Sequence, residues 1–328
     1  MPTAPVRPVA RPTARWRGEL TTLTYRVAGA VLQHVPDRVT VPVAEVVARA
    51  LLPRRAAELA MYRRHLARVL GRPLGPAEAA RADRAVSASY ARYWVEVFSL
   101  PGVPGTVVDA RMQVISGWPA LQAALESDRG VILALPHVGA WEWGGAWLAH
   151  LGHPMTAVAE VLEPPALFDW FARQRQAMGI TVLPLSSSAG PALMRILRAG
   201  GLIGLVADRD LPGTGTPVTF FGEETTMPSG PATLALRTGA ALFPTAVYQG
   251  PGRLHSAVIL PAVDTARTGD LRADVRRVTQ AVADGFEDLI RRAPEQWYCF
   301  QANWPTDGDG APAGAGPPDP DRERQQVP

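Results

Sequence analysis

Residues 130–151 read GVILALPHVGAWEWGGAWLAHL, and this stretch indicates how the chain folds. The uninterrupted apolar run over 130–136 is typical of a strand that is covered on both faces. A helix is expected over about 140–151. A buried strand that leads through a short loop into a helix is the building unit of a layered α/β domain.

The same alternation continues after this stretch. Strands are predicted over 155–160, 181–185, 202–207, 242–248 and 255–260, with an extended segment over 217–221. Helices are predicted over 165–178, 191–199, 229–238 and 271–292, the third of them capped by Ser229 with Pro231 in its first turn. This order predicts the α/β fold class, with a mixed central sheet flanked by helices.

The chain before this region is expected to be helical. Apolar residues recur there at spacings of three and four, and many arginines decorate the same segments: Arg54, Arg55, Arg63, Arg64 and Arg68. Those arginines form either a solvated face or a basic surface that touches anionic lipid. We predict a disordered tail over 1–14, a membrane-facing helical region over 15–100, an α/β core over 101–306 that forms one domain with it, and a second disordered tail over 307–328.

Composition excludes several classes of protein. Of the 328 residues, 47% are hydrophobic, so the chain can bury a sizeable core and is not globally disordered. A single cysteine, Cys299, excludes a disulfide scaffold and is interpreted as a core residue. All basic residues are arginine, which excludes Schiff-base and P-loop lysine chemistry. With no Cys/His finger, RNA-binding signature or long basic run, no nucleic-acid partner is expected.

The apolar runs are too short to cross a bilayer. None approaches the roughly 18–20 residues that a spanning helix needs, and the N-terminal residues lack the apolar core of a signal peptide. The net charge of +3 permits an anionic partner without requiring one. A peripheral protein on the cytoplasmic face of the plasma membrane is therefore expected.

The loop after the first strand contains the candidate chemistry. His137 follows the strand directly, and Glu142 comes five positions later in the first turn of the predicted helix. A carboxylate on one imidazole nitrogen would fix the tautomer and leave the other nitrogen to take a proton from a hydroxyl. Taken alone, the pair could equally be a capping histidine with a surface glutamate.

Five longer stretches decide between these interpretations. In chain order they are SYARYWVEVFSLP (89–101), HVGAWEWGGAWL (137–148), VAEVLEPPALFDWFARQRQAMG (158–179), the long block over 201–244 that begins GLIGLVADRD, and PEQWYCFQANWP (294–305). In this order they resemble the lysophospholipid acyltransferase superfamily. The closest resemblance is to the bacterial branch shared by lipid A lauroyl/myristoyl acyltransferases and actinobacterial phosphatidylinositol mannoside acyltransferases. The likeness spans about residues 20 to 305 and implies a glycerol-3-phosphate acyltransferase-like fold.

The resemblance implies an O-acyltransferase that moves a long acyl chain from acyl-CoA, as co-substrate, to a hydroxyl of a membrane glycolipid. The implied acceptor is the mannose of a phosphatidylinositol mannoside. His137 would be the general base and Glu142 would orient it, without a covalent intermediate. Asp208 is the candidate second carboxylate, or else the partner of Arg209 in a salt bridge.

The same resemblance suggests a set of substrate-binding residues. A phosphate would be bound by Arg175, unless this residue only forms a solvated helix face; Arg173 and Arg209 are weaker candidates for that role. Trp141 and Trp143 would line a sugar or acyl site, with Gly139 keeping the loop open. No metal ion and no cofactor are expected, and the other five histidines are interpreted as structural residues that lack acidic partners: His34, His65, His150, His153 and His255.

Two departures from the mannoside branch leave the acceptor open. Glu142 stands where that branch is associated with Asp, and Asp208 stands where it tends to have Glu. Alternatives are therefore another glycolipid or a lysophospholipid as acceptor, a thioesterase, and a non-catalytic peripheral lipid-binding protein.

Overall fold

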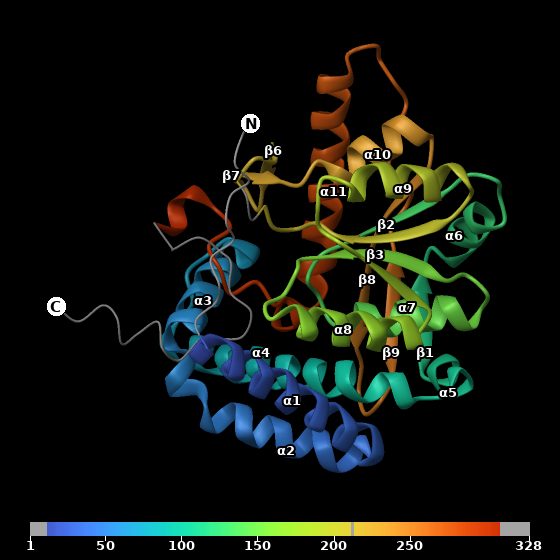
Figure 1. The fold of residues 1–328 in the computed structure, drawn as a ribbon. Helices are drawn as coiled ribbons and strands as arrows, with labels where there is room; N and C mark the ends of the chain where they lie inside the picture. Colours follow the sequence, from blue (N-terminus) through green and yellow to red (C-terminus); the bar gives the residue numbers. More distant parts are fainter. Residues whose placement is uncertain (1–11, 211–212, 309–328) are drawn as a thin grey trace, which may run out of the picture.

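Strand β2 (Val131–Leu135) lies in the middle of a seven-stranded sheet. The structure is a computed structural model that describes residues 12–210 and 213–308. Within these residues the strand order is β1-β9-β8-β2-β5-β3-β4, and only β8 and β9 are antiparallel neighbours. The predicted fold class, a mixed α/β sheet with helices, is confirmed (Figure 1).

The bounds of the other sheet strands are β1 (Met112–Ser116), β3 (Met155–Ala159), β4 (Ile180–Pro184), β5 (Leu202–Val206), β8 (Ala241–Gln249) and β9 (His255–Ile259). A separate hairpin consists of β6 (Thr216–Phe220) and β7 (Glu223–Met227). The core helices are α5 (Gly105–Ala110), α6 (Trp118–Leu125), α7 (Trp141–His150), α8 (Pro165–Ala177), α9 (Ala189–Arg198), α10 (Gly230–Thr238) and α11 (Leu271–Arg292).

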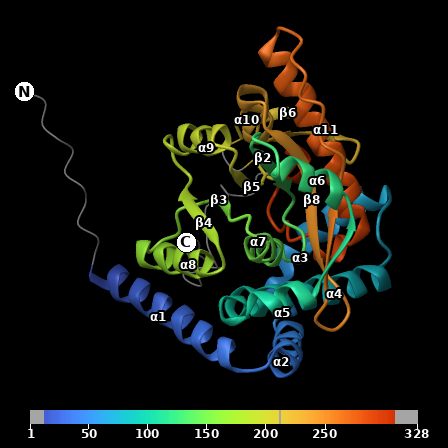
Figure 2. The ribbon, with the colours of Figure 1, turned by 90° about the vertical axis from the view of Figure 1, so that its right-hand side faces the viewer.

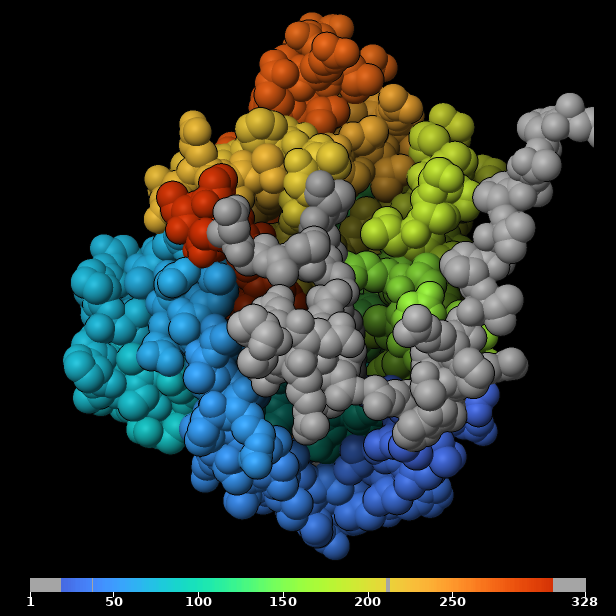
Figure 3. All heavy atoms as spheres, turned by 60° about the vertical axis from the view of Figure 1, so that its left-hand side comes forward, coloured from blue at the N-terminus to red at the C-terminus, as the bar shows by residue number. Residues whose placement is uncertain are grey.

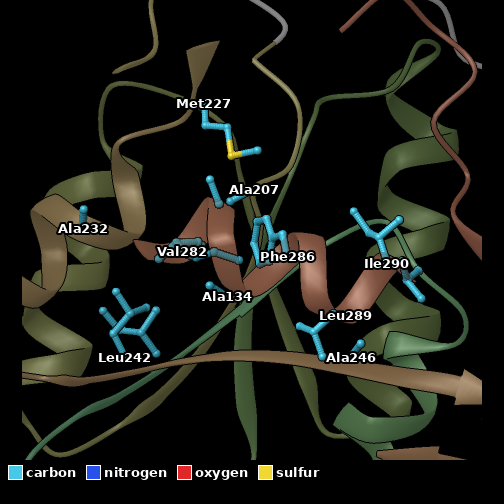
Figure 4. Packing of buried hydrophobic residues seen from close by; sticks show 14 of the residues in the cluster. Ala134, Ala207, Met227, Ala232, Leu242, Ala246, Val282, Phe286, Leu289 and Ile290 are labelled. Carbon is cyan, nitrogen blue, oxygen red and sulfur yellow. The ribbon is translucent and has the colours of Figure 1, made fainter. Parts of the chain in front are cut away.

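The two faces of the sheet carry separate hydrophobic cores, and β2 contributes to both. Ile132 and Ala134 belong to the core under α9, α10 and α11, whereas Val131, Leu133 and Leu135 belong to the core under α5, α6 and α7. This division follows from the period of two along a strand. Figure 4 shows the first core, in which apolar side chains of α11 pack over the sheet.

Some predicted details differ from the structure. Strand β1, helices α5 and α6, and strand β7 were not predicted. Ser229 does precede α10, but its side chain makes no capping hydrogen bond; the side chain that caps a helix here is Asp270, which accepts two N–H groups at the start of α11.

The N-terminal helical region packs against one side of the core. It consists of α1 (Pro12–His34), α2 (Asp37–Ala50), η1 (Leu52–Arg55), α3 (Ala56–Leu70), α4 (Pro76–Ser99) and η2 (Leu100–Gly102). An aromatic cluster joins it to α8, since Tyr25 of α1 and Phe98 of α4 both contact Trp170 or its neighbour Phe171. Figure 2 shows α1 and α2 along the edge of the molecule.

The last described residues form a closing segment over 293–308, which includes η3 (Pro294–Gln296) and η4 (Pro305–Asp307). It lies against α3, as Figure 3 shows. Asp307 was predicted to begin a disordered tail, but its side chain is fully buried and ion-paired with Arg68. The predicted tails otherwise fall almost entirely outside the described residues, except that α1 already begins at Pro12.

Candidate active site

The loop between β2 and α7 carries His137 and is fixed from two sides. The Tyr298 N–H of the closing segment donates to the His137 carbonyl at 2.9 Å, and the Ala140 N–H donates to the Val247 carbonyl of β8 at 2.8 Å. The His137 side chain is 31% exposed. The loop therefore holds a partly accessible imidazole at the end of the central strand.

Gly139 allows this loop to approach β8 closely. Its φ is +61°, and a Cβ built on it would lie 2.1 Å from the Val247 carbonyl oxygen. Any other residue would clash with backbone that cannot give way. The sequence suggested that Gly139 allows another group to approach closely. In the structure that group is the backbone of β8.

Asp208 reaches His137 because β2 and β5 are parallel neighbours. Leu135 pairs with Val206 in the register, and each functional residue follows two positions later. The His137 ring Nδ1 lies 2.5 Å from Asp208 Oδ1. Asp208 Oδ2 accepts the His137 backbone N–H at 3.1 Å and the Trp297 indole N–H at 2.8 Å.

The environment of Asp208 keeps it charged. The side chain is fully buried, which by itself would raise its pKa. The electrostatic interactions with the His137 ring and with the Arg209 guanidinium, together with the hydrogen bonds from His137 and Trp297, outweigh burial and lower the pKa of Asp208 to about 2. A carboxylate of this kind accepts from the Nδ1–H of the imidazole and leaves the lone pair on Nε2.

The structure differs from the predicted pairing of His137 with Glu142. Glu142 is buried in the first turn of α7, and its Oε1 accepts hydrogen bonds from Arg175 of α8 at 3.0 Å and from the Tyr93 hydroxyl of α4 at 3.2 Å. The reason is the direction of the helix, since the first turn of α7 faces α4 and α8 while the loop before it faces β5. Asp208 takes the place next to the histidine.

Burial has the largest effect on the pKa of Glu142, which is ion-paired with Arg175. It raises the pKa of Glu142, against the opposing effect of the Arg175 guanidinium. Glu142 Oε2 and Arg175 Nε are buried without a hydrogen-bond partner among the described residues. Arg175 is therefore a largely buried side chain that is ion-paired with Glu142, not a solvated one.

Arg209 contacts the other side of the His137 ring. One terminal nitrogen lies 2.8 Å from His137 Nε2, and the other donates to Gln301 Oε1. No direct ion pair joins Arg209 to Asp208 in the described part of the chain. Each side chain instead contacts a different nitrogen of the His137 ring, which lies between them.

The remaining predicted binding residues have diverse surroundings. Trp143 is buried and stacks on His255, with ring centroids 4.0 Å apart. Trp141 is half-buried and lies under the Arg175 guanidinium, 5.3 Å away. Arg173 is exposed on α8. Of these three, Trp141 alone borders the pocket described next.

An apolar pocket lies between α7 and the sheet. Its lining includes Leu135, Trp141, Gly144, Met155 and Val247. One lining residue, Leu135, is two residues before His137 in the sequence. The pocket lining comes from four strands and two helices that are distant in sequence, so no sequence motif identified it.

Two histidines predicted to lack acidic partners have them. His65 Nε2 lies 3.1 Å from Asp307 Oδ2, and His255 Nε2 lies 3.1 Å from Glu96 Oε2. Both rings are at least 99% buried, which fits the structural role that the sequence suggested. Within residues 12–210 and 213–308, no group of three or more His, Cys, Asp or Glu side chains could hold a metal ion.

Several contact residues of the site were missed by sequence reasoning. Tyr93, Trp297 and Gln301 hold Glu142, Asp208 and Arg209 respectively. All three lie in stretches that carried the resemblance, but the stretches alone gave them no role.

Comparisons with known proteins identify the family of this chain. The family model of bacterial lipid A biosynthesis acyltransferases matches residues 11–306. The chain is 38% identical over 295 residues to a phosphatidylinositol mannoside acyltransferase of Mycolicibacterium smegmatis, covering 88% of this chain and 93% of the relative. It is 42% identical over 252 residues to a protein of the same name from Mycobacterium tuberculosis, covering 75% of this chain and 77% of the relative.

Proposed function

The chain belongs to the bacterial lipid A biosynthesis acyltransferase family, and from this premise we propose that it acylates a hydroxyl of a membrane glycolipid with acyl-CoA as donor. The proposed acceptor is the mannose of a phosphatidylinositol mannoside, after the names of its relatives. The observation that carries the proposal is the His137–Asp208 pair, in which the imidazole is partly exposed at the end of the central strand.

In the proposed mechanism His137 is the general base. Its Nε2 takes the proton of the acceptor hydroxyl while the hydroxyl oxygen attacks the thioester carbonyl carbon. The new C–O bond forms and the C–S bond breaks, and the proton passes from His137 to the departing sulfur. Asp208 holds the Nδ1–H throughout and favours the positive charge that develops on the ring.

Glu142 acts at a distance in this proposal. It does not touch His137, and its ion pair with Arg175 joins α7 to α8 beside the pocket. Its role is to position the start of α7 and Trp141.

The test is mass spectrometry of the products that purified protein forms from palmitoyl-CoA. The acceptors are a phosphatidylinositol mannoside, a lipid A precursor and a lysophospholipid, each also incubated with His137→Ala. We expect palmitoyl transfer to the mannoside alone. Transfer to one of the other acceptors would replace the proposed acceptor, and release of free palmitate alone would make the protein a thioesterase.

We also propose that α1 and α2 bind the cytoplasmic face of the plasma membrane. Eight of the fifteen exposed large apolar residues in the described part of the chain lie on these helices, each at least half exposed: Leu20, Leu23, Val27, Val31, Val39, Val43, Val46 and Val47. Their spacing puts them on one stripe of each helix. No helix among the described residues has the length and apolarity to cross a bilayer.

The arginines of this surface differ from those first expected to meet lipid. Arg55, Arg63 and Arg68 are ion-paired with protein carboxylates. Arg26 and Arg38, on α1 and α2 themselves, are exposed and form no ion pair among the residues that the structure describes. An apolar stripe with flanking arginines fits a surface of anionic lipid.

Vesicle co-sedimentation tests this surface. The double variant Val43→Ser/Val46→Ser should bind phosphatidylinositol-containing vesicles about tenfold more weakly, because two apolar side chains are lost from the contact. The matched control is Leu185→Ser/Leu254→Ser, which alters exposed apolar residues elsewhere. Equal binding of both double variants would contradict the proposed membrane face.

A further inference from the structure

The nitrogen that must accept a proton is already occupied in the free protein. Since the Asp208 carboxylate can only accept, the hydrogen between it and His137 belongs to Nδ1, and Nε2 carries the lone pair. That lone pair accepts a hydrogen bond from the Arg209 guanidinium, 2.8 Å away. Arg209 also opposes a positive charge on the ring at this distance. While this contact lasts, His137 cannot act as a base.

Arg209 is held less firmly than the other arginines around the site. Both of its acceptors, His137 Nε2 and Gln301 Oε1, are neutral, and its Nε is buried without a partner among the described residues. Arg175, by contrast, is bound to a carboxylate. A phosphate adds a full negative charge that neither present acceptor carries, and a guanidinium matches two of its oxygens at once.

We propose that Arg209 is a removable cap on the base, and that a phosphate of a bound substrate draws the guanidinium away and frees His137 Nε2. This proposal rests on the proposed function, in which both substrates carry phosphate: the donor in coenzyme A, the acceptor in its phosphodiester. The cap leaves the base inactive until the phosphate binds, so that water near a bound thioester is not activated.

Nitrogen NMR of histidine-labelled protein tests the cap without turnover. His137 signals are identified as those missing from His137→Ala, and spectra are taken at pH 8, where a free imidazole with a pKa of about 6.5 is neutral. A lone-pair nitrogen that accepts a hydrogen bond resonates upfield of a free one. We expect the His137 Nε2 signal to move downfield in Arg209→Ala and to stay unchanged in Arg195→Ala, an exposed control on α9.

Two phosphate probes added to the wild-type protein identify the source. Adenosine 3′,5′-bisphosphate represents the donor headgroup, and glycerophosphoinositol represents the acceptor headgroup. The probe that moves the wild-type Nε2 signal downfield is the one that removes the cap. This measurement does not depend on the folding of any variant at position 209.

Two results would overturn the proposal. One is a His137 Nε2 signal that is the same in the wild-type protein and in Arg209→Ala. The other is a wild-type signal that neither probe moves. Failure of the proposed function would look different, because His137→Ala would then retain acyl transfer whatever the spectra show.

Discussion

The pair formed by His137 and Asp208 and the pair formed by His65 and Asp307 use the same residue types in different surroundings. Both aspartates are fully buried, and each accepts from a histidine ring. The His137 ring is 31% exposed and the His65 ring is fully enclosed. One pair faces a space that a substrate can enter, and the other joins two segments of the fold.

The remaining ring nitrogens show what each pair can do. His65 uses both nitrogens within the protein, since Nδ1 lies 3.0 Å from the Cys299 carbonyl oxygen and Nε2 contacts Asp307. His137 uses Nδ1 for Asp208, and the Arg209 guanidinium contacts Nε2. A histidine–carboxylate pair thus indicates catalysis only where one nitrogen can be freed.

The largest expected effect separates the two histidines. His137→Ala should lower the rate of acyl transfer by about 10²–10⁴-fold with little change in melting temperature, because it removes the base and leaves the core intact. His65→Ala should do the reverse, lowering the melting temperature while each folded molecule keeps its activity. Transfer assays beside thermal unfolding of both variants check this. Near-wild-type transfer by His137→Ala would show that the His137–Asp208 pair is not catalytic.

The second effect ranks the two carboxylates near the loop. Asp208→Asn should lower kcat by about 10²-fold or more, since the neutral amide no longer favours the charged ring. Glu142→Gln should lower kcat by about tenfold or less, because its partner is Arg175 rather than His137. Steady-state kinetics with each substrate varied in turn decide the ranking. If Glu142→Gln lowered kcat more than Asp208→Asn, the result would favour the predicted pairing of His137 with Glu142.

A smaller effect concerns stability alone. Asp307 accepts hydrogen bonds from His65, Arg68 and the backbone N–H groups of Asn303 and Trp304. Asp307→Asn should lower the free energy of unfolding by about 2–3 kcal/mol, as expected for weakening a buried ion pair that keeps its shape. Urea unfolding measures this loss. A matching loss of kcat in the folded variant would mean that the two pairs are not independent.

The smallest effect is the pH dependence of that stabilisation. Burial alone would raise the pKa of Asp307, but hydrogen bonds from His65, Asn303 and Arg68 hold it well below its usual range. A pKa lowered by folding stabilises the protein fully above the unfolded value of about 3.9 and progressively less below it. The difference between the wild-type protein and Asp307→Asn should be constant from pH 7 to 5 and shrink below pH 4. A difference that grew in acid would contradict the direction of the shift.

Local pattern predicted most of the fold. The strands β2, β3, β5 and β9 and the helices α7 and α11 lie within about one residue of their predicted bounds, because their apolar runs and periodicities are long. Helix α6 was missed, and so was strand β1, which lies at the edge of the sheet, has no buried residue and shows no apolar run. The family predicted from the ordered blocks is confirmed by the family model.

The candidate site was predictable only in part. His137, Glu142, Asp208, Arg175 and Arg209 do come together, but their pairing depends on which strands are neighbours. Nearness in sequence favoured Glu142 as the partner of His137, whereas β5 lies beside β2 and places Asp208 there.

The closing segment has a consequence for how the protein is synthesised. Trp297 donates to Asp208, and Tyr298 holds the loop that carries His137. A nascent chain still lacking these residues has made the strands, the base and its carboxylate, but not the contacts that fix them relative to one another. The polypeptide therefore gains its catalytic geometry late in translation, so that a ribosome that stalls before Trp297 leaves a sheet without an assembled site.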